Sequence, residues 1–557
     1  MKTPVVWWRN HFGNFDHGLI AELLLPEHRR PNSYDFERVP FESIGSLGCV
    51  LVVPTRGMLA PEVEEVRRFI NARSWCLVFA MGDEETRVPV GDFKLPNSLV
   101  WVQTPRPENL PKGVRPMFLG APIRTRELVQ ETIGVPAPAK TIEWAFFGQA
   151  GHSKRDECIG AMRKIDDAAV NVSGGFTQGL PRELYLARLA MTKLAPSPSG
   201  PETPDCFRTW EALEVGALPV VDKSSPKRNY PGGYYVFANE GARVPFDAVA
   251  HWDEFHAIVE QGKSDPLELT RRASFASAWW ARKKRDYAKA IDRDLFDVSG
   301  VRARNNRVAD KLTILMPTSP IPSHPDDTVI EDSIARLRGY VELDDVEIVI
   351  MFDGVPAKLA HRAEAYEEFK RRIMWRVHFD PLFENVRPLV FERPTHQANM
   401  TRAALREVDT PLVMFVEHDT WPCGEIPFAD LCRLVETNDQ GVNVVRLQHY
   451  GGDVHPEHRY LLARPERVEV CDVPLYLTRQ WSQRPHIARA DFYRRVIAQH
   501  FDESAWTMIE DVVHGPCAVS KWSEFGVAIY APPGDMKRSE TCDGRGTDPK
   551  FEDDFTR

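Results

Sequence analysis

Short unbroken apolar runs recur along this chain, separated by polar segments and by stretches with helical spacing. One run occupies residues 412–416, inside the sequence PLVMFVEHDTWP. A run without alternation is typical of a strand that is buried on both faces. This run ends in Glu417, His418 and Asp419. Because ligands of open α/β sheets bind beyond the carboxyl ends of the strands, we expect site chemistry at this point.

The N-terminal part of the chain, residues 1–140, alternates between predicted strands and helices. The run CVLVVP predicts a buried strand at 49–54, a helix is predicted at 61–73, and the next strand is predicted at 75–80. Shorter strands are predicted at 5–8, 100–103 and 116–119. This β-α-β order favours a parallel sheet.

A second α/β unit is predicted to begin at residue 141. A strand at 143–147 is followed by the loop GQAGHS, which begins at Gly148 and leads into a helix. Backbone N–H groups of a glycine loop between a strand and a helix can bind a phosphate. Many turns between a strand and a helix share this composition, so the loop indicates an anion site only together with other residues.

The segment 266–296 is predicted to form a long basic helix. Its large side chains Phe275, Trp279, Trp280 and Tyr287 recur at nearly helical spacing. A stripe of this kind is more often a packing surface than a nucleic-acid platform. We expect the helix to close the first module by packing across it. The polar residues after it, 297–310, are interpreted as a linker and as the main domain boundary.

The C-terminal module repeats the α/β rhythm. Strands are predicted at 312–316, 346–351 and 387–391, the first ending in Pro317-Thr318-Ser319 and the second in Phe352-Asp353-Gly354. Helices are predicted at 326–338 and 395–408, and the second leads into the run at 412–416. The histidines 449, 455 and 458 are typical of an exposed polar loop, with an acceptor-side lid as the alternative.

Composition narrows the choice of protein class. A length of 557 residues predicts two to four domains, and 43% hydrophobic with 27% charged residues is ordinary for a globular protein. The net charge of −10 does not favour a nucleic-acid backbone as the main partner, although a local basic groove stays open. Nine cysteines without a C-x-x-C pair indicate reduced thiols.

We expect a cytoplasmic protein. The longest apolar runs are too short to span a bilayer, and the N-terminus lacks the apolar core of a signal peptide. Peripheral association with the inner face of a membrane stays open.

The stretch KLAPSPSGPETPDCFRTWEALEVGALPVV, residues 193–221, carries the first resemblance. It predicts a loop, a helix at 205–215 with Asp205 as N-cap and Gly216 after its end, and a strand. It resembles the donor-binding half of GT-B glycosyltransferases, the exostosin-like group in particular. The resemblance implies that Arg208 binds the phosphates of a sugar nucleotide, together with the loop at Gly148. It implies further that Glu211 or Glu214 accepts hydrogen bonds from ribose or sugar hydroxyls. The alternative is an amphipathic helix whose Arg and Glu side chains are solvated.

The C-terminal module resembles the large inverting family of GT-A glycosyltransferases, which contains many polysaccharide enzymes. On this resemblance Thr318 and Asp353 flank the nucleotide, and Glu417-His418-Asp419 takes the place of the D-x-D motif. Asp419 would hold Mg²⁺ or Mn²⁺ with Glu417, because hard oxygens suit these ions. His514 is a weaker candidate for a third metal contact, and His418 is interpreted as a neighbour and not as a ligand.

The pair Glu510-Asp511 lies at the distance past D-x-D where family members carry the general base. The resemblance implies that Asp511 takes the proton of the acceptor hydroxyl and that Glu510 orients the acceptor. The alternative is a helix N-terminus that favours acids through its dipole.

The sequence as a whole therefore predicts an α/β protein with two glycosyltransferase modules. The first is a GT-B unit with Rossmann-like halves at 1–140 and 141–300, and the second is a metal-dependent GT-A unit at 311–557. The predicted function is a bifunctional transfer of sugars from nucleotide-sugar donors to a glycan or glycoconjugate. Three alternatives stay open: a single active GT-A module, a carbohydrate-binding scaffold without turnover, and a transferase that acts on modified bases in DNA.

Overall fold

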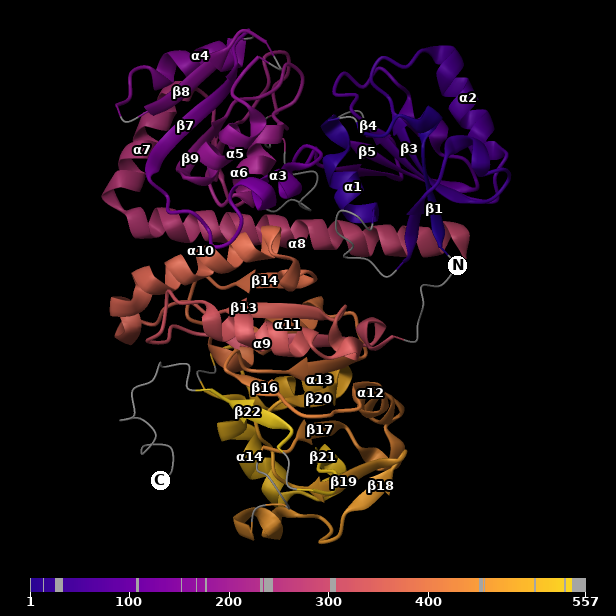
Figure 1. Cartoon of the computed structure of the whole chain (residues 1–557), viewed down its shortest axis with the longest axis vertical. Helices are drawn as coiled ribbons and strands as arrows, with labels where there is room; N and C mark the ends of the chain where they lie inside the picture. Colours follow the sequence, from indigo (N-terminus) through magenta and orange to yellow (C-terminus); the bar gives the residue numbers. More distant parts are fainter. Residues whose placement is uncertain are drawn as a thin grey trace. The chain divides into compact units, whose positions relative to one another are not determined.

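The computed structural model forms two compact α/β units (Figure 1). Unit 1 comprises Met1–Ala303 with Met374–Pro381, and unit 2 comprises Arg304–Ile373 with Leu382–Arg557. The structure describes residues 2–13, 15–25, 34–106, 110–151, 153–166, 168–175, 178–230, 234, 244–300, 307–449, 454, 456–504, 507–534 and 537–542.

Unit 1 contains two parallel sheets. The first has the order β2-β1-β3-β4-β5-β6 and the second the order β11-β10-β9-β7-β8. The first is built from β1 (Thr3–Trp7), β2 (Phe36–Arg38), β3 (Cys49–Pro54), β4 (Cys76–Met81), β5 (Ser98–Gln103) and β6 (Val114–Met117). The second is built from β7 (Ile142–Gln149), β8 (Ala168–Ser173), β9 (Thr192–Ser197), β10 (Leu218–Asp222) and β11 (Asp247–Val249). Central strands such as β4 are buried along their whole length because helices cover both faces of a parallel sheet.

The helices of unit 1 follow the strands as crossover connections of a parallel sheet require. They are α1 (Gly18–Leu24), α2 (Ala60–Asn71), α3 (Thr125–Thr132), α4 (Ser153–Met162), α5 (Arg182–Ala190), α6 (Phe207–Glu214), α7 (Phe255–Ser264) and α8 (Pro266–Ser299).

The long helix α8 packs against both halves of unit 1, as predicted (Figure 1). Tyr287 accepts a hydrogen bond at its hydroxyl from the N–H of Phe118, at 3.1 Å. Trp280 packs against Trp210 with ring centroids 4.3 Å apart. Both Trp280 and Tyr287 are buried, so the aromatic stripe is a packing surface.

Unit 2 is organised around one mixed sheet of order β14-β13-β12-β15-β20-β17-β21-β19-β18. Its first four strands are parallel: β12 (Leu312–Thr318), β13 (Glu347–Phe352), β14 (Val386–Val390) and β15 (Leu412–Phe415). The others are β17 (Val444–Leu447), β18 (Val468–Val470), β19 (Val473–Thr478), β20 (His486–Arg489) and β21 (Val527–Tyr530). A separate ribbon pairs β16 (Thr420–Pro422) with β22 (Ser539–Thr541).

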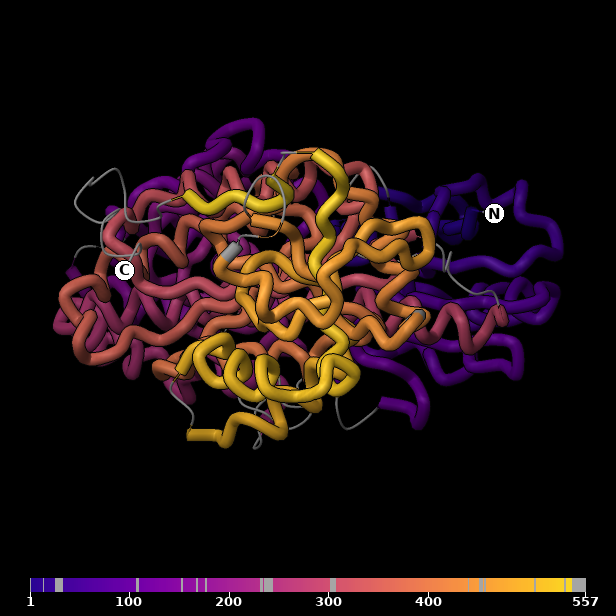
Figure 2. The backbone as a smooth tube through the Cα atoms, turned by 90° about the horizontal axis from the view of Figure 1, so that it is seen from below, coloured from indigo at the N-terminus to yellow at the C-terminus, as the bar shows by residue number. Residues whose placement is uncertain are grey.

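The C-terminal strands of unit 2 pair with strands from earlier in the sequence: β22 with β16, and β21 with β17. In the backbone tube of Figure 2, yellow C-terminal segments accordingly lie beside orange ones. The helices from residue 311 onward are α9 (Thr328–Arg338), α10 (Ala363–Phe379), α11 (His396–Glu407), α12 (Phe428–Thr437), α13 (Ala490–His500), α14 (Ile509–Val519) and α15 (Trp522–Phe525). No helix in the described part of the chain combines the length and the apolar character needed to cross a bilayer.

The predicted strands at 49–54 and 312–316 and the predicted helix at 395–408 correspond to β3, β12 and α11. The prediction that Asp205 caps a helix is wrong. The N-cap of α6 is Cys206, and its side chain makes no capping hydrogen bond. Asp205 is buried and accepts hydrogen bonds from the indole N–H of Trp210 at 2.6 Å and from the N–H of Leu119 at 2.9 Å. It therefore ties α6 to the first sheet.

Candidate functional site

A cavity of about 1010 Å³ opens in unit 2 at the carboxyl ends of β12, β13 and β15. From β12 the chain adds β13 and β14 on one side and then returns to place β15 on the other side of β12, so the strand order reverses at β12. Crevices of open α/β sheets form at such a reversal of strand order. The cavity thus lies where the apolar runs of the sequence end in polar residues.

Besides Asp353, two pairs of carboxylates from distant segments of the sequence line this cavity. Glu417 and Asp419 follow β15, and Glu510 and Asp511 occupy the first turn of α14. Burial raises the pKa of Glu417 to about 7, and the negative charges of Asp419 and Glu510 add to this. Asp511 is exposed at the cavity. The structure therefore brings Glu417 and Asp419 to the same cavity as Glu510 and Asp511.

Gln397, on α11, connects these segments and was not predicted. Its Nε2 donates to Oε1 of Glu417 at 3.0 Å, and its Oε1 accepts the N–H of Ile509 at 3.0 Å. The same oxygen accepts Nε2 of Gln483 at 2.6 Å, while the N–H of Gln483 donates to Oε2 of Glu510 at 2.9 Å. A buried amide of this kind orients both acidic segments. A lone glutamine in an amphipathic helix gives no sequence signal of this role.

The predicted nucleotide residues also line the cavity, and both have partners inside the protein. The hydroxyl of Thr318 lies 3.1 Å from the hydroxyl of Tyr366. Asp353 accepts the N–H groups of Gly354 at 2.8 Å and Thr395 at 2.6 Å. Burial raises the pKa of Asp353, and these backbone N–H groups act against that shift. Asp353 thus fixes the start of α11 beside the cavity.

Cationic and imidazole side chains line the cavity as well. They are Arg446, Arg484, His396, His418, His449 and His458. Arg446 donates to Oε1 of Gln480 at 2.6 Å, and Arg484 donates to the hydroxyl of Thr541 at 2.5 Å. His449 is half-buried rather than in an exposed loop, and burial lowers its pKa to about 4. His455 lies outside the described residues.

The predicted trio of Glu417, Asp419 and His514 does not assemble into a metal-binding group. Among the described residues no group of three His, Cys, Asp or Glu side chains could hold a metal ion. His514 is absent from the cavity lining, and its Nδ1 lies 3.1 Å from the carbonyl of Trp481. The neighbouring carboxylates still fit a hard divalent ion, provided that water or ligand oxygens complete its coordination.

The residues predicted to bind a donor in unit 1 are engaged in internal contacts. Glu211 accepts the hydroxyl of Tyr185 at 2.7 Å, and Glu214 accepts Nζ of Lys284 at 3.1 Å. Both carboxylates are only 4% exposed, so the alternative of a solvated helix face is wrong. Arg208 donates to the carbonyl of Phe147 at 2.7 Å and packs against Gly148, where an added Cβ would lie 2.2 Å from its Nη2.

Comparisons with known proteins give weak likenesses. No family model matches this chain, and no curated protein sequence matches it. Among solved structures, TarS of S. aureus aligns at a TM-score of 0.26 and 15% identity, over 42% of this chain and 37% of TarS. The mannosyltransferase PcManGT from Pyrobaculum calidifontis, solved with GDP-Man and Mn²⁺, aligns at 0.24 and 13%, over 48% of this chain and 69% of that chain. The bifunctional IspDF from Campylobacter jejuni aligns at 0.21 and 12%, over 37% and 47% of the two chains. TM-scores this far below 0.5 do not establish a shared fold. The geometry of the chain itself is that of an α/β protein whose second unit holds a cavity lined by carboxylates.

Proposed function

We propose that unit 2 is a nucleotide-sugar-dependent glycosyltransferase that inverts the anomeric centre and uses a divalent cation. One observation carries this proposal: Asp419 and Asp511, far apart in sequence, line the same cavity at the carboxyl edge of the parallel strands. A displacement at an anomeric carbon needs negative charge stabilised on the leaving side and a base on the attacking side. The cavity offers carboxylates from two separate segments for these tasks.

Asp511 is proposed as the group that accepts the proton of the acceptor hydroxyl. It is exposed at the cavity, so an incoming hydroxyl can reach its carboxylate. The neighbouring Glu510 accepts the N–H of Gln483 and is held in place by it. In this proposal Glu510 orients the acceptor while Asp511 removes its proton, and the acceptor oxygen then bonds to the anomeric carbon as the bond to the diphosphate breaks.

Glu417 and Asp419 are proposed to hold Mn²⁺ or Mg²⁺ on the donor side. When bound, such an ion neutralises the charge that develops on the departing diphosphate. Arg446 and Arg484 line the same cavity and supply further positive charge for phosphate oxygens. Thr318 and Asp353 are proposed to lie against the nucleoside, because they stand at the ends of adjacent strands.

The sequence also predicts a second transferase site, in unit 1, which would make the protein bifunctional. Arg208 and the loop at Gly148 remain its proposed phosphate contacts, while Glu211 and Glu214 are already occupied by Tyr185 and Lys284. We therefore assign turnover to unit 2 and keep an Arg208→Ala variant as the test of unit 1. Full transfer of every sugar by this variant would leave unit 2 as the single transferase.

The test is a screen of UDP-, GDP-, dTDP- and CMP-sugars with Mn²⁺, read out by the release of the nucleotide. A donor that binds the native protein should also raise its melting temperature. Turnover should fall in Asp419→Ala and in Asp511→Asn, and should persist in Asp332→Asn, an exposed aspartate on α9. Undiminished turnover in both cavity variants would overturn the proposal. Transfer onto duplex DNA, weakened strongly by salt, would identify a modified base as the acceptor.

A further inference from the structure

A second cavity, of about 490 Å³, lies in unit 1 and takes no part in the function proposed above. Its lining comes mainly from the loops that follow β1, β3, β4 and β5, which are neighbouring parallel strands. These loops meet at the carboxyl edge of the first sheet, the edge where ligands of parallel sheets bind. The proline-rich loops of this part of the sequence do not predict any site chemistry.

Three buried polar atoms at this cavity have no hydrogen-bond partner among the described residues. They are Nε1 of Trp8, the hydroxyl of Thr104 and Oε2 of Glu84. Trp8 is 5% exposed and Thr104 is fully buried. Unpaired buried polar atoms also occur elsewhere in the described part of the chain, but here three of them gather around one cavity at the carboxyl edge of a sheet. A single polar ligand in this cavity would pair all three.

Thr104 is also held in a strained conformation. Its φ is +47°, which a β-branched residue adopts only when the surrounding structure enforces it. The N–H of Thr104 donates to the carbonyl of Met117 at 3.0 Å, which anchors the loop to the neighbouring strand. Strain of this kind gathers at ligand sites because it places a side chain where regular backbone would not.

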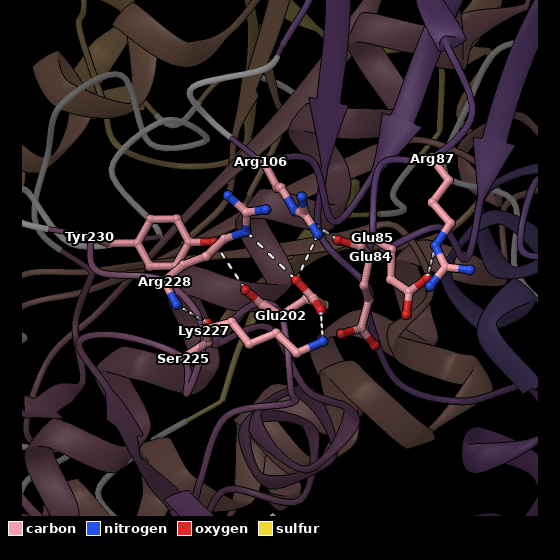
Figure 3. A network of polar contacts seen from close by, with 9 residues as sticks. All are labelled: Glu84, Glu85, Arg87, Arg106, Glu202, Ser225, Lys227, Arg228 and Tyr230. Atoms are coloured by element: carbon pink, nitrogen blue, oxygen red, sulfur yellow. Dashed lines mark hydrogen bonds and ion pairs between the residues drawn. The ribbon is translucent and has the colours of Figure 1, made fainter. Parts of the chain in front are cut away.

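The carboxylates of Glu84 and Glu202 differ in the partners that they have (Figure 3). Glu202 accepts Nη2 of Arg106 at 2.7 Å and is also paired with Lys227 and Arg228. The carboxylate of Glu84 has no dashed line to any residue drawn, although Arg106 holds its backbone carbonyl at 3.1 Å. An added Cβ at Gly200 would lie 3.1 Å from Oε2 of Glu84, so glycine leaves room for this carboxylate. Burial raises the pKa of Glu84 to about 7, with Arg56 and Arg155 acting against the shift and Glu202 and Glu85 adding to it.

The rest of the lining favours a neutral, polyhydroxylated ligand over an anion. Of the two arginines in the lining, Arg9 is already paired with Glu62 and Glu65, and Arg56 lies beside the acidic residues Glu84 and Asp16. Phe15 is 38% exposed at the cavity and meets Phe207 edge to face, with ring centroids 5.0 Å apart. The guanidinium of Arg182 lies over one face of the Phe15 ring, 4.8 Å from its centroid. The part of the ring that stays exposed suits the C–H face of a sugar, while the unpaired donor and acceptors suit its hydroxyls.

We propose that this cavity of unit 1 binds a carbohydrate, with Glu84 accepting a hydrogen bond from a sugar hydroxyl and Trp8 donating one from its indole N–H. Phe15 packs against the ring, and Thr104 pairs with a further hydroxyl. The site is separate from the transferase proposed for unit 2 and does not depend on it. In this proposal unit 1 binds the end of a glycan, whichever unit carries out turnover.

The experiment is saturation-transfer NMR on the full chain with the methyl glycosides of glucose, galactose, mannose and N-acetylglucosamine, and separately with UDP and GDP. We expect a saturation-transfer signal, which indicates binding, for at least one of the glycosides. Glu84→Gln and Trp8→Phe, which keep side-chain shape, should weaken its affinity by about tenfold or more each. Glu85→Gln is the matched control, because Glu85 is the adjacent acid and is not part of the cavity lining.

Binding in an Asp419→Ala, Asp511→Asn variant separates this proposal from the transferase. Glycoside binding that persists there and falls in Glu84→Gln supports the site in unit 1, even if no turnover is found. Three results would overturn the proposal. The first is the absence of a saturation-transfer signal for every glycoside, and the second is an unchanged glycoside affinity in both Glu84→Gln and Trp8→Phe. The third is a signal for UDP or GDP but for no glycoside, if that signal disappears in Trp8→Phe. Thermal unfolding of each variant at pH 5, where Glu84→Gln should have little effect on stability, should be unchanged within a few degrees and shows that lost binding is not lost folding.

Discussion

Nε2 of Gln397 donates to Oε1 of Glu417 at 3.0 Å, which joins helix α11 to the acidic segment after β15. Through its own oxygen the same side chain holds the N–H of Ile509, the residue before Glu510 and Asp511. One buried amide therefore sets the relative position of the two acidic segments of the cavity. Its removal should affect both folding and turnover.

Gln397→Met keeps the length of the side chain and removes its hydrogen bonds. In this variant the N–H of Ile509 and Nε2 of Gln483 lose the oxygen to which they donate hydrogen bonds. We expect the free energy of unfolding to fall by roughly 2–4 kcal/mol, because each buried group left unpaired costs about 1–3 kcal/mol. Calorimetry of the unit 2 transition measures this. Gln499→Met, at an exposed glutamine on α13, is the control, and equal melting temperatures for the two variants would contradict the role of Gln397.

Asp511→Asn should reduce kcat without weakening donor binding. A general base contributes about 10²–10⁴-fold, and its loss leaves the contacts to the leaving group in place. Steady-state kinetics and donor titration by calorimetry together measure the split. An equal loss of donor affinity would show that Asp511 belongs to the donor side instead.

Removal of divalent cations with EDTA should abolish the thermal stabilisation by the donor. The carboxylates of Glu417 and Asp419 would then face the diphosphate without a bridging charge. Mn²⁺ or Mg²⁺ should restore both the melting temperature and nucleotide release. If donor binding and turnover proceed fully in EDTA, the metal part of the proposal is wrong, while the base role of Asp511 can still be measured.

Glu84 should make unit 1 less stable as the pH rises. Burial raises the pKa of Glu84 in the folded state to about 7 from its ordinary 4.5, so the folded state holds this proton where the unfolded state releases it. Its contribution is complete below about pH 4.5 and is lost as the pH rises through about 7, a change of roughly 3 kcal/mol. Glu84→Gln should therefore raise the melting temperature of unit 1 at pH 8 and have little effect at pH 5. A gain of equal size at both pH values would show that Glu84 does not titrate in this range.

Lys284→Met should destabilise unit 1 by about 3–5 kcal/mol, because it leaves Glu214 as an uncompensated buried charge. Lys284 lies 3.1 Å from Glu214 and 2.8 Å from Glu22, and both Lys284 and Glu214 are buried. The double variant Lys284→Met, Glu214→Gln should regain most of the loss in chemical denaturation. If Glu214→Gln instead left stability unchanged and removed nucleotide-sugar binding, its role would be that of a donor contact.

The apolar pattern by itself determined the strands and most of the helices that build the sheets. Runs such as 49–54 and 412–416 have apolar side chains on both faces of the strand, so they predict a sheet that is covered on both faces without knowledge of the strands that pair with them. The same pattern put Glu417 and Asp419 at the end of a central strand, where a cavity forms.

Only the tertiary structure decided which polar side chains meet. Gln397 and Glu84 look unremarkable in sequence, yet Gln397 joins two acidic segments, and Oε2 of Glu84 faces a cavity without a hydrogen-bond partner among the described residues. Glu214 and His514 looked like ligand residues, yet Lys284 pairs with the first and the carbonyl of Trp481 lies against the second. Local periodicity fixes which face of an element is buried, whereas the partner of a buried polar group comes from a distant segment that only the folded chain brings near.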